Sequence, residues 1–179
     1  VHAGRRAVFL RFAGCNLWTG REEDRSTAVC QFCDTDFVGM NGENGGRYEA
    51  HALAAKVADI WGDGSDHRYV VMTGGEPMLF AEMMPLCRRL KEAGLHITIE
   101  TAGTLDLPVE CDLMSISPKL ANSTPDREAH PHWSRRHERS RWRPDVIRKL
   151  MALALVTTMC AAVLFQPVLM GPPREKIEH

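Results

Sequence analysis

Apolar positions in the first two thirds of the chain follow two different periods. Residues 7–12 are an apolar, β-rich run that ends at Ala13-Gly14, which predicts a strand and a turn. Apolar residues recur at helical spacing over 50–61 and again over 83–90, where Gly94 closes the pattern, so two amphipathic helices are expected. Further strands are predicted at 69–72, 96–100 and 113–117.

Strands that alternate with helices indicate an α/β fold with a mainly parallel sheet. The polar stretch 19–29 and the glycine-containing stretch 39–46 show no period and are predicted to be loops. In parallel sheets, chemistry gathers beyond the C-terminal ends of the strands. The residues that follow predicted strands are Cys15, Gly74 to Pro77, Glu100, Thr101 and Ser117 to Lys119.

Composition supports an ordinary globular chain. The 179 residues are 44% hydrophobic and carry 22 basic against 23 acidic side chains, which gives a net charge of −1. This length suits a single domain with a real core, and a near-neutral total argues against a dedicated nucleic-acid binder. Residues 127–149 are locally basic, with a net charge of +5 and interleaved Trp133 and Trp142. A solvated helix-and-loop face explains that stretch better than a nucleic-acid surface.

The run from Met151 to Met170 contains no charged residue and has the length of a membrane-spanning helix. Thr157, Thr158, Gln166 and Pro167 interrupt it, so a core helix followed by a strand is the favoured interpretation. The chain opens at Val1 with neither an initiator Met nor a signal pattern, and we expect an upstream segment to be missing.

Three of the six cysteines, Cys15, Cys30 and Cys33, have the spacing C-x14-C-x2-C. Soft thiolates select zinc, copper or iron–sulfur clusters, and three ligands without a fourth would leave one iron of a 4Fe–4S cluster open. The alternative is a zinc site completed by a histidine, and spacing alone does not separate the two. Burial as small hydrophobes is the favoured interpretation for Cys87, Cys111 and Cys160.

Polar groups at two other positions suggest binding. The glycines of Thr73-Gly74-Gly75-Glu76-Pro77 would let a ligand approach the backbone, and Glu76 offers a carboxylate to an ammonium group; a tight turn without a ligand is the alternative. Arg11 either points to solvent or faces the interior, where it would need an anionic partner.

Two short segments offer further donors and ligands. Asp34-Thr35-Asp36 supplies hard oxygens that suit magnesium, unless it is only a polar turn. Ser117-Pro118-Lys119 supplies hydroxyl and ammonium donors, unless it is an ordinary loop.

Five motifs in this order resemble the 7-carboxy-7-deazaguanine synthase family. They are Phe12 to Trp18, the cysteine spacing, Cys33 to Phe37, Thr73 to Pro77 and Ser117 to Lys119. These enzymes are radical S-adenosylmethionine proteins of the queuosine and 7-deazapurine pathway. Most such proteins space their cysteines C-x3-C-x2-C, and the expanded first gap here is similar to one branch of the synthases. The resemblance implies a partial (β/α) barrel of mainly parallel strands in one domain over residues 1–179. Residues 1–125 match the family well, and residues 126–179 are divergent or truncated.

The resemblance also implies roles for individual residues. Cys15, Cys30 and Cys33 would hold a 4Fe–4S cluster, Thr35 would bind Mg2+, and Arg11 and Thr73 would contact substrate. The positions that match S-adenosylmethionine contacts are Phe32, Cys33, Asp34, Gly75, Glu76, Ser117, Pro118 and Lys119.

The implied reaction is the conversion of 6-carboxy-5,6,7,8-tetrahydropterin to 7-carboxy-7-deazaguanine with loss of ammonia, after reductive cleavage of S-adenosylmethionine to a radical. The family implies a cytoplasmic homodimeric lyase that is reduced by a flavodoxin or ferredoxin and binds neither nucleic acid nor membrane directly. The family's Gln-Gly-Glu-Gly turn precedes the position of Val1. The alternatives are another radical enzyme, such as a glycyl-radical activase, and a zinc-stabilised binding module.

Overall fold

Five parallel strands form a single sheet whose spatial order is the order of the sequence. The computed structural model describes residues 4–64, 67–123, 128, 131–153 and 155–158. The strands are β1 (Val8–Phe12), β2 (Tyr69–Gly74), β3 (His96–Thr101), β4 (Leu113–Ile116) and β5 (Leu155–Thr158).

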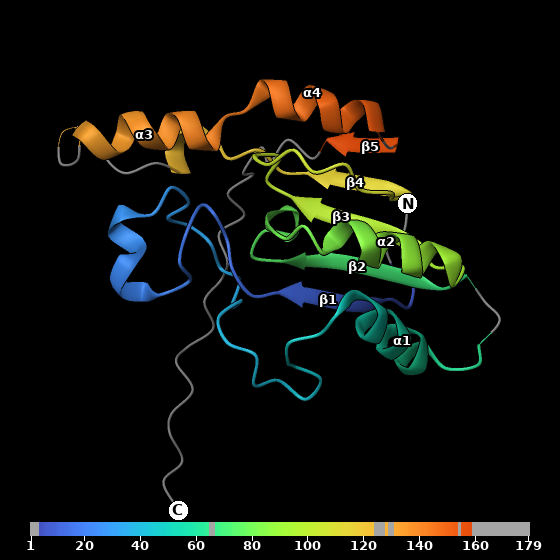
Figure 1. The fold of residues 1–179 in the computed structure, drawn as a ribbon. Helices are drawn as coiled ribbons and strands as arrows, with labels where there is room; N and C mark the ends of the chain where they lie inside the picture. Colours follow the sequence, from blue (N-terminus) through green and yellow to red (C-terminus); the bar gives the residue numbers. More distant parts are fainter. Residues whose placement is uncertain (1–3, 65–66, 124–127, 129–130, 154, 159–179) are drawn as a thin grey trace, which may run out of the picture.

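Helices connect the strands and cover the sheet. Helices α1 (Ala50–Trp61) and α2 (Met83–Glu92) lie side by side in front of the sheet in Figure 1. Helices α3 (Pro131–Arg141) and α4 (Pro144–Leu153) come between β4 and β5, and α4 contacts both of these strands. Three short 3-10 helices complete the fold: η1 (Glu22–Thr27), η2 (Pro77–Leu79) and η3 (Ala121–Ser123).

One apolar cluster joins the helices to the sheet. Because side chains alternate along a strand, the register places Val70, Ile97 and their neighbours on one face. That face packs against the buried stripes of α1, α2 and α4. The fully buried residues of this cluster include Met72, Ile97, Ile99 and Met114 of the strands and Leu86, Leu90 and Leu150 of the helices.

The predicted elements are confirmed with small shifts at their ends. The first helix has the predicted bounds, and β2, β3, β4 and the second helix begin at the predicted residues. Strand β1 begins at Val8, one residue later than predicted. The stretch 19–29 differs from the prediction, because η1 gives it a regular turn. In the part of the chain that the structure describes, the start of the uncharged run forms the end of α4, up to Leu153, and then β5. Within the described residues, no helix is long and apolar enough to cross a membrane. Cys160 and the residues from Met159 onward lie outside the described part of the chain.

All five strand arrows point toward the same edge of the sheet. The segment that contains the first cysteines, drawn in blue, and α3 both lie beyond this edge in Figure 1. The fold therefore places the candidate chemistry where a parallel sheet ordinarily carries it.

Candidate functional site

A backbone contact closes the long gap between the first two cysteines. The carbonyl oxygen of Leu17 accepts hydrogen bonds from the N–H groups of Val29 at 2.9 Å and Cys30 at 3.2 Å. Leu17, Val29 and Cys30 form a small apolar cluster against which Cys15 and Cys33 pack. The 14-residue gap is thereby folded back on itself, and the three cysteines predicted as ligands lie together.

The three thiols are free and differ in their readiness to ionise. A hydrogen bond from the Cys30 thiol lowers the pKa of Cys33 to about 6, and the same bond together with burial raises the pKa of Cys30. Burial raises the pKa of Cys15, although the Leu17 N–H donates to its Sγ at 3.4 Å. Hydrogen bonds of this kind to cysteine sulfurs tune iron–sulfur centres.

The three thiols are neighbours, because Cys15 and Cys33 both pack against the apolar cluster that contains Cys30. A 4Fe–4S cluster spreads its cysteine ligands over several irons, so it requires three neighbouring thiols. The thiol arrangement therefore fits the cluster interpretation of the cysteine spacing.

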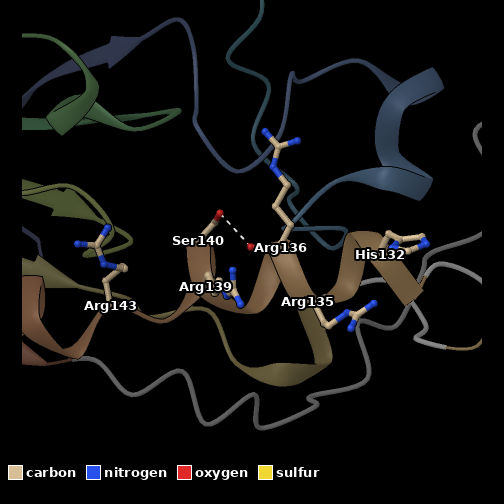
Figure 2. Close-up of a pocket in the computed structure, with 6 residues that line it drawn as sticks. All are labelled: His132, Arg135, Arg136, Arg139, Ser140 and Arg143. Carbon is tan, nitrogen blue, oxygen red and sulfur yellow. Dashed lines mark hydrogen bonds between the residues drawn. The ribbon is translucent and has the colours of Figure 1, made fainter.

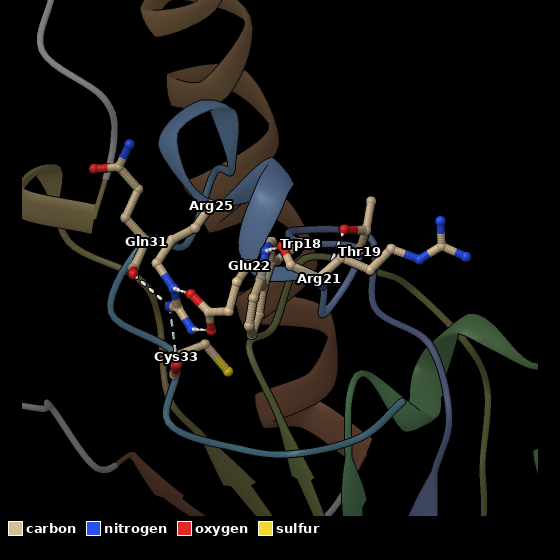
Figure 3. Close-up of polar contacts among 7 residues, drawn as sticks. All are labelled: Trp18, Thr19, Arg21, Glu22, Arg25, Gln31 and Cys33. Carbon is tan, nitrogen blue, oxygen red and sulfur yellow. Dashed lines mark hydrogen bonds and ion pairs between the residues drawn. The ribbon is translucent and has the colours of Figure 1, made fainter. Parts of the chain in front are cut away.

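The segment between Cys15 and Cys30 is a folded clip. Trp18, Ala28 and Phe37 form a second small apolar cluster on which Cys15 and Cys33 also pack. The Arg25 guanidinium lies on the Trp18 ring and bonds the backbone near Cys33 (Figure 3). Arg25 was not among the predicted site residues. The signal available in the sequence was a basic residue in the same gap between Cys15 and Cys30 as Trp18.

The two glycines of the β2 turn are required by chain packing. The Gly75 N–H donates to the Phe12 carbonyl at 2.9 Å, and the Glu76 N–H donates to the Gly14 carbonyl at 2.8 Å. A methyl group on Gly75 would lie 1.9 Å from the Gly14 oxygen. Gly74 has a φ of 116° and touches the backbone of Phe12. The close approach predicted for a ligand is therefore made by the segment that leads to Cys15.

Glu76 is buried, with 1% of its surface exposed, and ties two strand ends together. Its carboxylate accepts hydrogen bonds from the Thr101 hydroxyl at 2.7 Å and from the N–H groups of Ala102 at 2.9 Å and Met78 at 3.1 Å. Burial raises the pKa of Glu76, which these bonds oppose. The hydrogen-bond network is internal, and the predicted role toward an ammonium group remains a prediction.

The loop after β4 lies near the same centre. The Ser117 N–H donates to the Thr101 carbonyl at 2.8 Å, and Arg141 of α3 donates to the Lys119 carbonyl at 2.9 Å. The charge of Lys119 acts on both Cys30 and Glu76 and opposes the rise of their pKa values. The structure thus brings Lys119, Glu76 and the cysteines together, with Pro118 buried between its neighbours.

The segment after Cys33 is more exposed. Phe32 and Asp34 lie at the surface, and the Thr35 hydroxyl is within 3.4 Å of the Asp34 carboxylate. Hydrogen bonds from Thr35 also contribute to the low pKa of Cys33. The predicted magnesium ligand is therefore adjacent to the thiol site.

Polar side chains also gather on the sheet face opposite the helices. Arg11 and Thr73 are register partners on β1 and β2, and Arg11 is exposed. The Thr73 hydroxyl donates to the Glu100 carboxylate of β3 at 2.8 Å. Within the described residues, Arg11 forms no ion pair with a carboxylate. Glu100 was predicted only to follow a strand, and its polar position on an alternating strand is the signal that places it on this face.

The basic stretch forms two neighbouring hollows beside the cysteine clip. The first is a shallow pocket of α3 lined by His132, Arg135, Arg136, Arg139, Ser140 and Arg143, as Figure 2 shows. The second lies between α3 and the clip, and Arg136 and Ser140 line both. Part of the local charge is paired, since Arg143 contacts Asp145 at 2.9 Å and Lys149 contacts Asp106 at 2.6 Å. The basic stretch is thus helical, and the choice of a solvated face over a nucleic-acid surface stays a prediction.

Residues 25–158 match the model of the Radical SAM superfamily, which is more than half of the chain. The chain belongs to the radical SAM superfamily. Membership implies a 4Fe–4S cluster and S-adenosylmethionine as cofactors, and it confirms the α/β fold of the partial-barrel type predicted from the sequence. The superfamily match favours the radical enzyme over the zinc-stabilised binding module.

Similar proteins carry one name. The chain is 58% identical over 120 residues to a 7-carboxy-7-deazaguanine synthase of Burkholderia multivorans, covering 66% of this chain and 57% of the relative. It is 50% identical over 131 residues to the synthase of Bradyrhizobium diazoefficiens, covering 73% of this chain and 62% of the relative. A crystal structure of QueE from Escherichia coli aligns with 65% of this chain and 53% of its own, at 27% identity and a TM-score of 0.47. The chain spans about three fifths of the length of these two curated relatives.

Proposed function

We propose that this chain is a radical S-adenosylmethionine lyase of 7-deazapurine biosynthesis, a 7-carboxy-7-deazaguanine synthase. The observation that carries the proposal is the gathering of three free thiols at the sheet edge that also presents Arg11 and Thr73. The relatives that bear this name support the choice within the superfamily. The substrate is 6-carboxy-5,6,7,8-tetrahydropterin, and the products are 7-carboxy-7-deazaguanine and ammonia.

Cys15, Cys30 and Cys33 are proposed to hold the cluster, which leaves one iron for the amino and carboxylate groups of S-adenosylmethionine. When both are bound, the cluster and S-adenosylmethionine supply the chemistry, which is one-electron reductive cleavage of a carbon–sulfur bond of S-adenosylmethionine. The protein's contribution is placement. Cys33 is the most readily ionised of the three thiols, so it is available as a thiolate ligand at neutral pH.

The proposed S-adenosylmethionine contacts surround this centre. Phe32 and Asp34 flank Cys33, Gly75 and Glu76 form the β2 turn, and Ser117 to Lys119 follow β4. The carboxylate of Glu76 is held rigidly by its three donors, which suits a role as a fixed negative charge. The Lys119 ammonium balances that charge.

Arg11 is proposed to bind the substrate carboxylate. Its planar guanidinium can donate two parallel hydrogen bonds to a carboxylate. Thr73 and Glu100 adjoin it on the next two strands, so a ring carrying both donors and acceptors can be oriented against the same face. The exposed Phe9 side chain, 64% accessible, offers that face an aromatic surface.

Several further features of this activity are part of the proposal. Thr35 is the expected Mg2+ ligand, a flavodoxin or ferredoxin is the expected reductant, and a cytoplasmic homodimer is the expected form. We also propose that residues 1–179 are one radical SAM domain, whose last third diverges from the relatives.

Anaerobic reconstitution followed by assay with the carboxypterin tests the activity. We expect iron and sulfide in near-equal amounts, cleavage of S-adenosylmethionine after reduction, and formation of the deazaguanine. Cleavage without conversion of this substrate would contradict the synthase assignment and favour another radical enzyme, such as a glycyl-radical activase. Zinc without sulfide would contradict the cluster itself.

Cys30→Ala tests the ligand set. The brown cluster absorbance should be lost, whereas Cys111→Ala, which changes a half-buried thiol of the main core region, should retain it. Retention of the absorbance in Cys30→Ala would show that the ligands are wrongly assigned.

A further inference from the structure

Arg25 connects the middle of the cysteine clip to the backbone of the C-x2-C segment. Its Nη1 donates to the carbonyl oxygens of Gln31 at 2.6 Å and Cys33 at 3.0 Å. Gln31 directly follows Cys30, and Cys33 ends the C-x2-C segment. A single side chain thus holds the backbone of this segment at two points, next to the second thiol and at the third (Figure 3).

The same guanidinium also reaches the region of the first cysteine. Its central carbon lies 4.1 Å from the ring centre of Trp18, three residues after Cys15. Trp18 is held in turn by an edge contact with Phe37, with ring centres 5.7 Å apart, and by a hydrogen bond from its Nε1 to the Arg21 carbonyl at 3.1 Å. Arg25 therefore stands between the two halves of the cysteine motif.

Glu22 orients the guanidinium. Its carboxylate accepts from both Nε and Nη2 of Arg25, which makes a two-pronged ion pair one turn apart on η1. The Arg25 side chain is 29% exposed and Glu22 is mostly exposed. The pair alone would contribute little to stability at a surface. Its effect is geometric, because it keeps the guanidinium over the Trp18 ring while Nη1 donates to the two carbonyls.

We propose that Arg25 is a positioning residue that pre-organises the expanded cysteine loop for the cluster. The proposal rests on the proposed cluster site. A flexible loop loses entropy on closure in proportion to the logarithm of its length, so an extended gap between two ligands disfavours cluster binding unless the gap is already folded. The contacts of Arg25 fold this gap before any metal arrives.

Lysine cannot replace this function. Its ammonium is a point charge with three donors, whereas the guanidinium presents a planar fork that stacks on an aromatic ring and donates in several directions. Arg25→Lys therefore keeps the charge near the thiols and removes the geometry. Arg25→Gln removes both. Arg21→Gln is the matched control, because Arg21 forms its hydrogen bonds with Trp18 and Thr19 through its backbone carbonyl and N–H.

Alkylation of the metal-free protein tests the proposal without the cluster. Cys30 is buried in the clip, and Cys87 is buried in the main core, so mass spectrometry with iodoacetamide reports local opening at one and global unfolding at the other. In both Arg25 variants, iodoacetamide should alkylate Cys30 about tenfold faster or more than in wild type. The loss of the charge-assisted hydrogen bonds lets the clip open and exposes this thiol. Cys87 should be modified at the wild-type rate. Equal rates at Cys30 in wild type and Arg25→Lys would overturn the proposal.

Reconstitution then tests the link to the cluster. At limiting iron, both Arg25 variants should retain less iron than wild type and Arg21→Gln. In the fraction that does load, the electron paramagnetic resonance signal of the reduced cluster should broaden and respond less to added S-adenosylmethionine. A wild-type protein that assembles no cluster would refute the proposed function alone, since the alkylation result stands apart from it. Full loading and unchanged spectra in both variants would refute the role of Arg25 in presenting the ligands.

Discussion

The main core and the cysteine clip are held together in different ways. The core joins strands β1 to β4 and helices α1, α2 and α4 through one large apolar cluster in which many side chains are fully buried. The clip has two small apolar clusters, and specific hydrogen bonds and one stacked cation connect them. Apolar burial is shared among many residues of the core, so each core side chain supports the whole fold, whereas the clip depends on a few contacts that each act at one place.

The difference separates stability from cofactor binding. Loss of a core side chain should weaken the whole fold, because the cluster is continuous. Loss of a clip contact should leave the fold intact and alter the arrangement of the thiols. Four substitutions test this division, and the first lies where the two regions meet.

Gly75→Ala should have the largest effect. The added methyl group would lie 1.9 Å from the Gly14 oxygen and 2.5 Å from its carbonyl carbon, and both are backbone atoms that lead directly to Cys15. We expect a loss of more than about 4 kcal/mol in the free energy of unfolding, in the range that marks a severe steric conflict. Urea unfolding measures it. Gly42→Ala is the control, because a methyl group added there would meet no atom of another segment within 4 Å.

Leu90→Ala should weaken the core without disturbing the clip. Leu90 is fully buried on α2. Removal of its side chain leaves a cavity, and the expected loss is about 3 kcal/mol in the free energy of unfolding. Iron uptake at low temperature should remain at the wild-type level. Leu79→Ala, at an exposed position, should change neither quantity. A strong fall in iron uptake with an unchanged unfolding free energy would contradict the division between regions.

Trp18→Ala should show the opposite behaviour. The substitution removes the surface on which Arg25 lies and the contact with Phe37. The cation contact contributes about 1 kcal/mol. The buried surface of Trp18 belongs to the small cluster with Ala28 and Phe37 and not to the main core, so the loss should fall on the clip and shift global unfolding less than Leu90→Ala does. Iron uptake and protection of the clip from proteolysis should fall. Trp142→Ala, which changes an exposed tryptophan of the basic stretch, should leave both as in wild type.

The smallest expected effect is the pH dependence of the stability that Asp112 contributes to the core region. Partial burial opposes ionisation of Asp112, yet hydrogen bonds from Lys91 at 2.6 Å and from the Ile97 N–H at 2.8 Å lower its pKa, with His96 nearby. The stabilisation is fully present above the ordinary aspartate pKa of about 3.9 and is lost as pH falls through the lower folded value.

Comparison of wild type with Asp112→Asn at several pH values measures this effect. We expect a difference below about 1 kcal/mol near neutral pH, as for a partly exposed pair, that shrinks in acid. The Cys30 alkylation rate should be the same in both proteins. A difference that grows as pH falls would show the wrong sign and reject the assignment.

Much of the fold could be predicted because the pattern is local. The helical stripe of α1 and the short apolar strands are direct consequences of periodic burial, and their bounds agree with the sequence to within a few residues. The turn after β2 could also be recognised, since adjacent glycines indicate close packing. The partner that packs there could not, because Gly14 lies 61 positions away and is brought near by the pairing of β1 with β2.

The proposed ligands of the candidate site could be predicted from the sequence, whereas the residues that hold those ligands in place could not. The cysteine spacing identified three ligands, but the stretch between them lacks a period and was predicted to be a loop. Its turn η1 depends on Arg25, Glu22 and Trp18, whose meeting requires the chain to fold back at Leu17. Likewise, Thr101 and Ala102 hold Glu76 only because β2 and β3 are neighbours.

The sequence by itself determined the alternation of strands and helices, the parallel sheet and the set of soft ligands, because periodic burial and cysteine spacing are local properties. The tertiary structure alone decided which distant groups touch. It placed the β2 glycines against the backbone before Cys15, buried Glu76 among three donors, and set Arg25 between the two halves of the cysteine motif. Such contacts arise from strand pairing and chain reversal, and no pattern within a single segment encodes them.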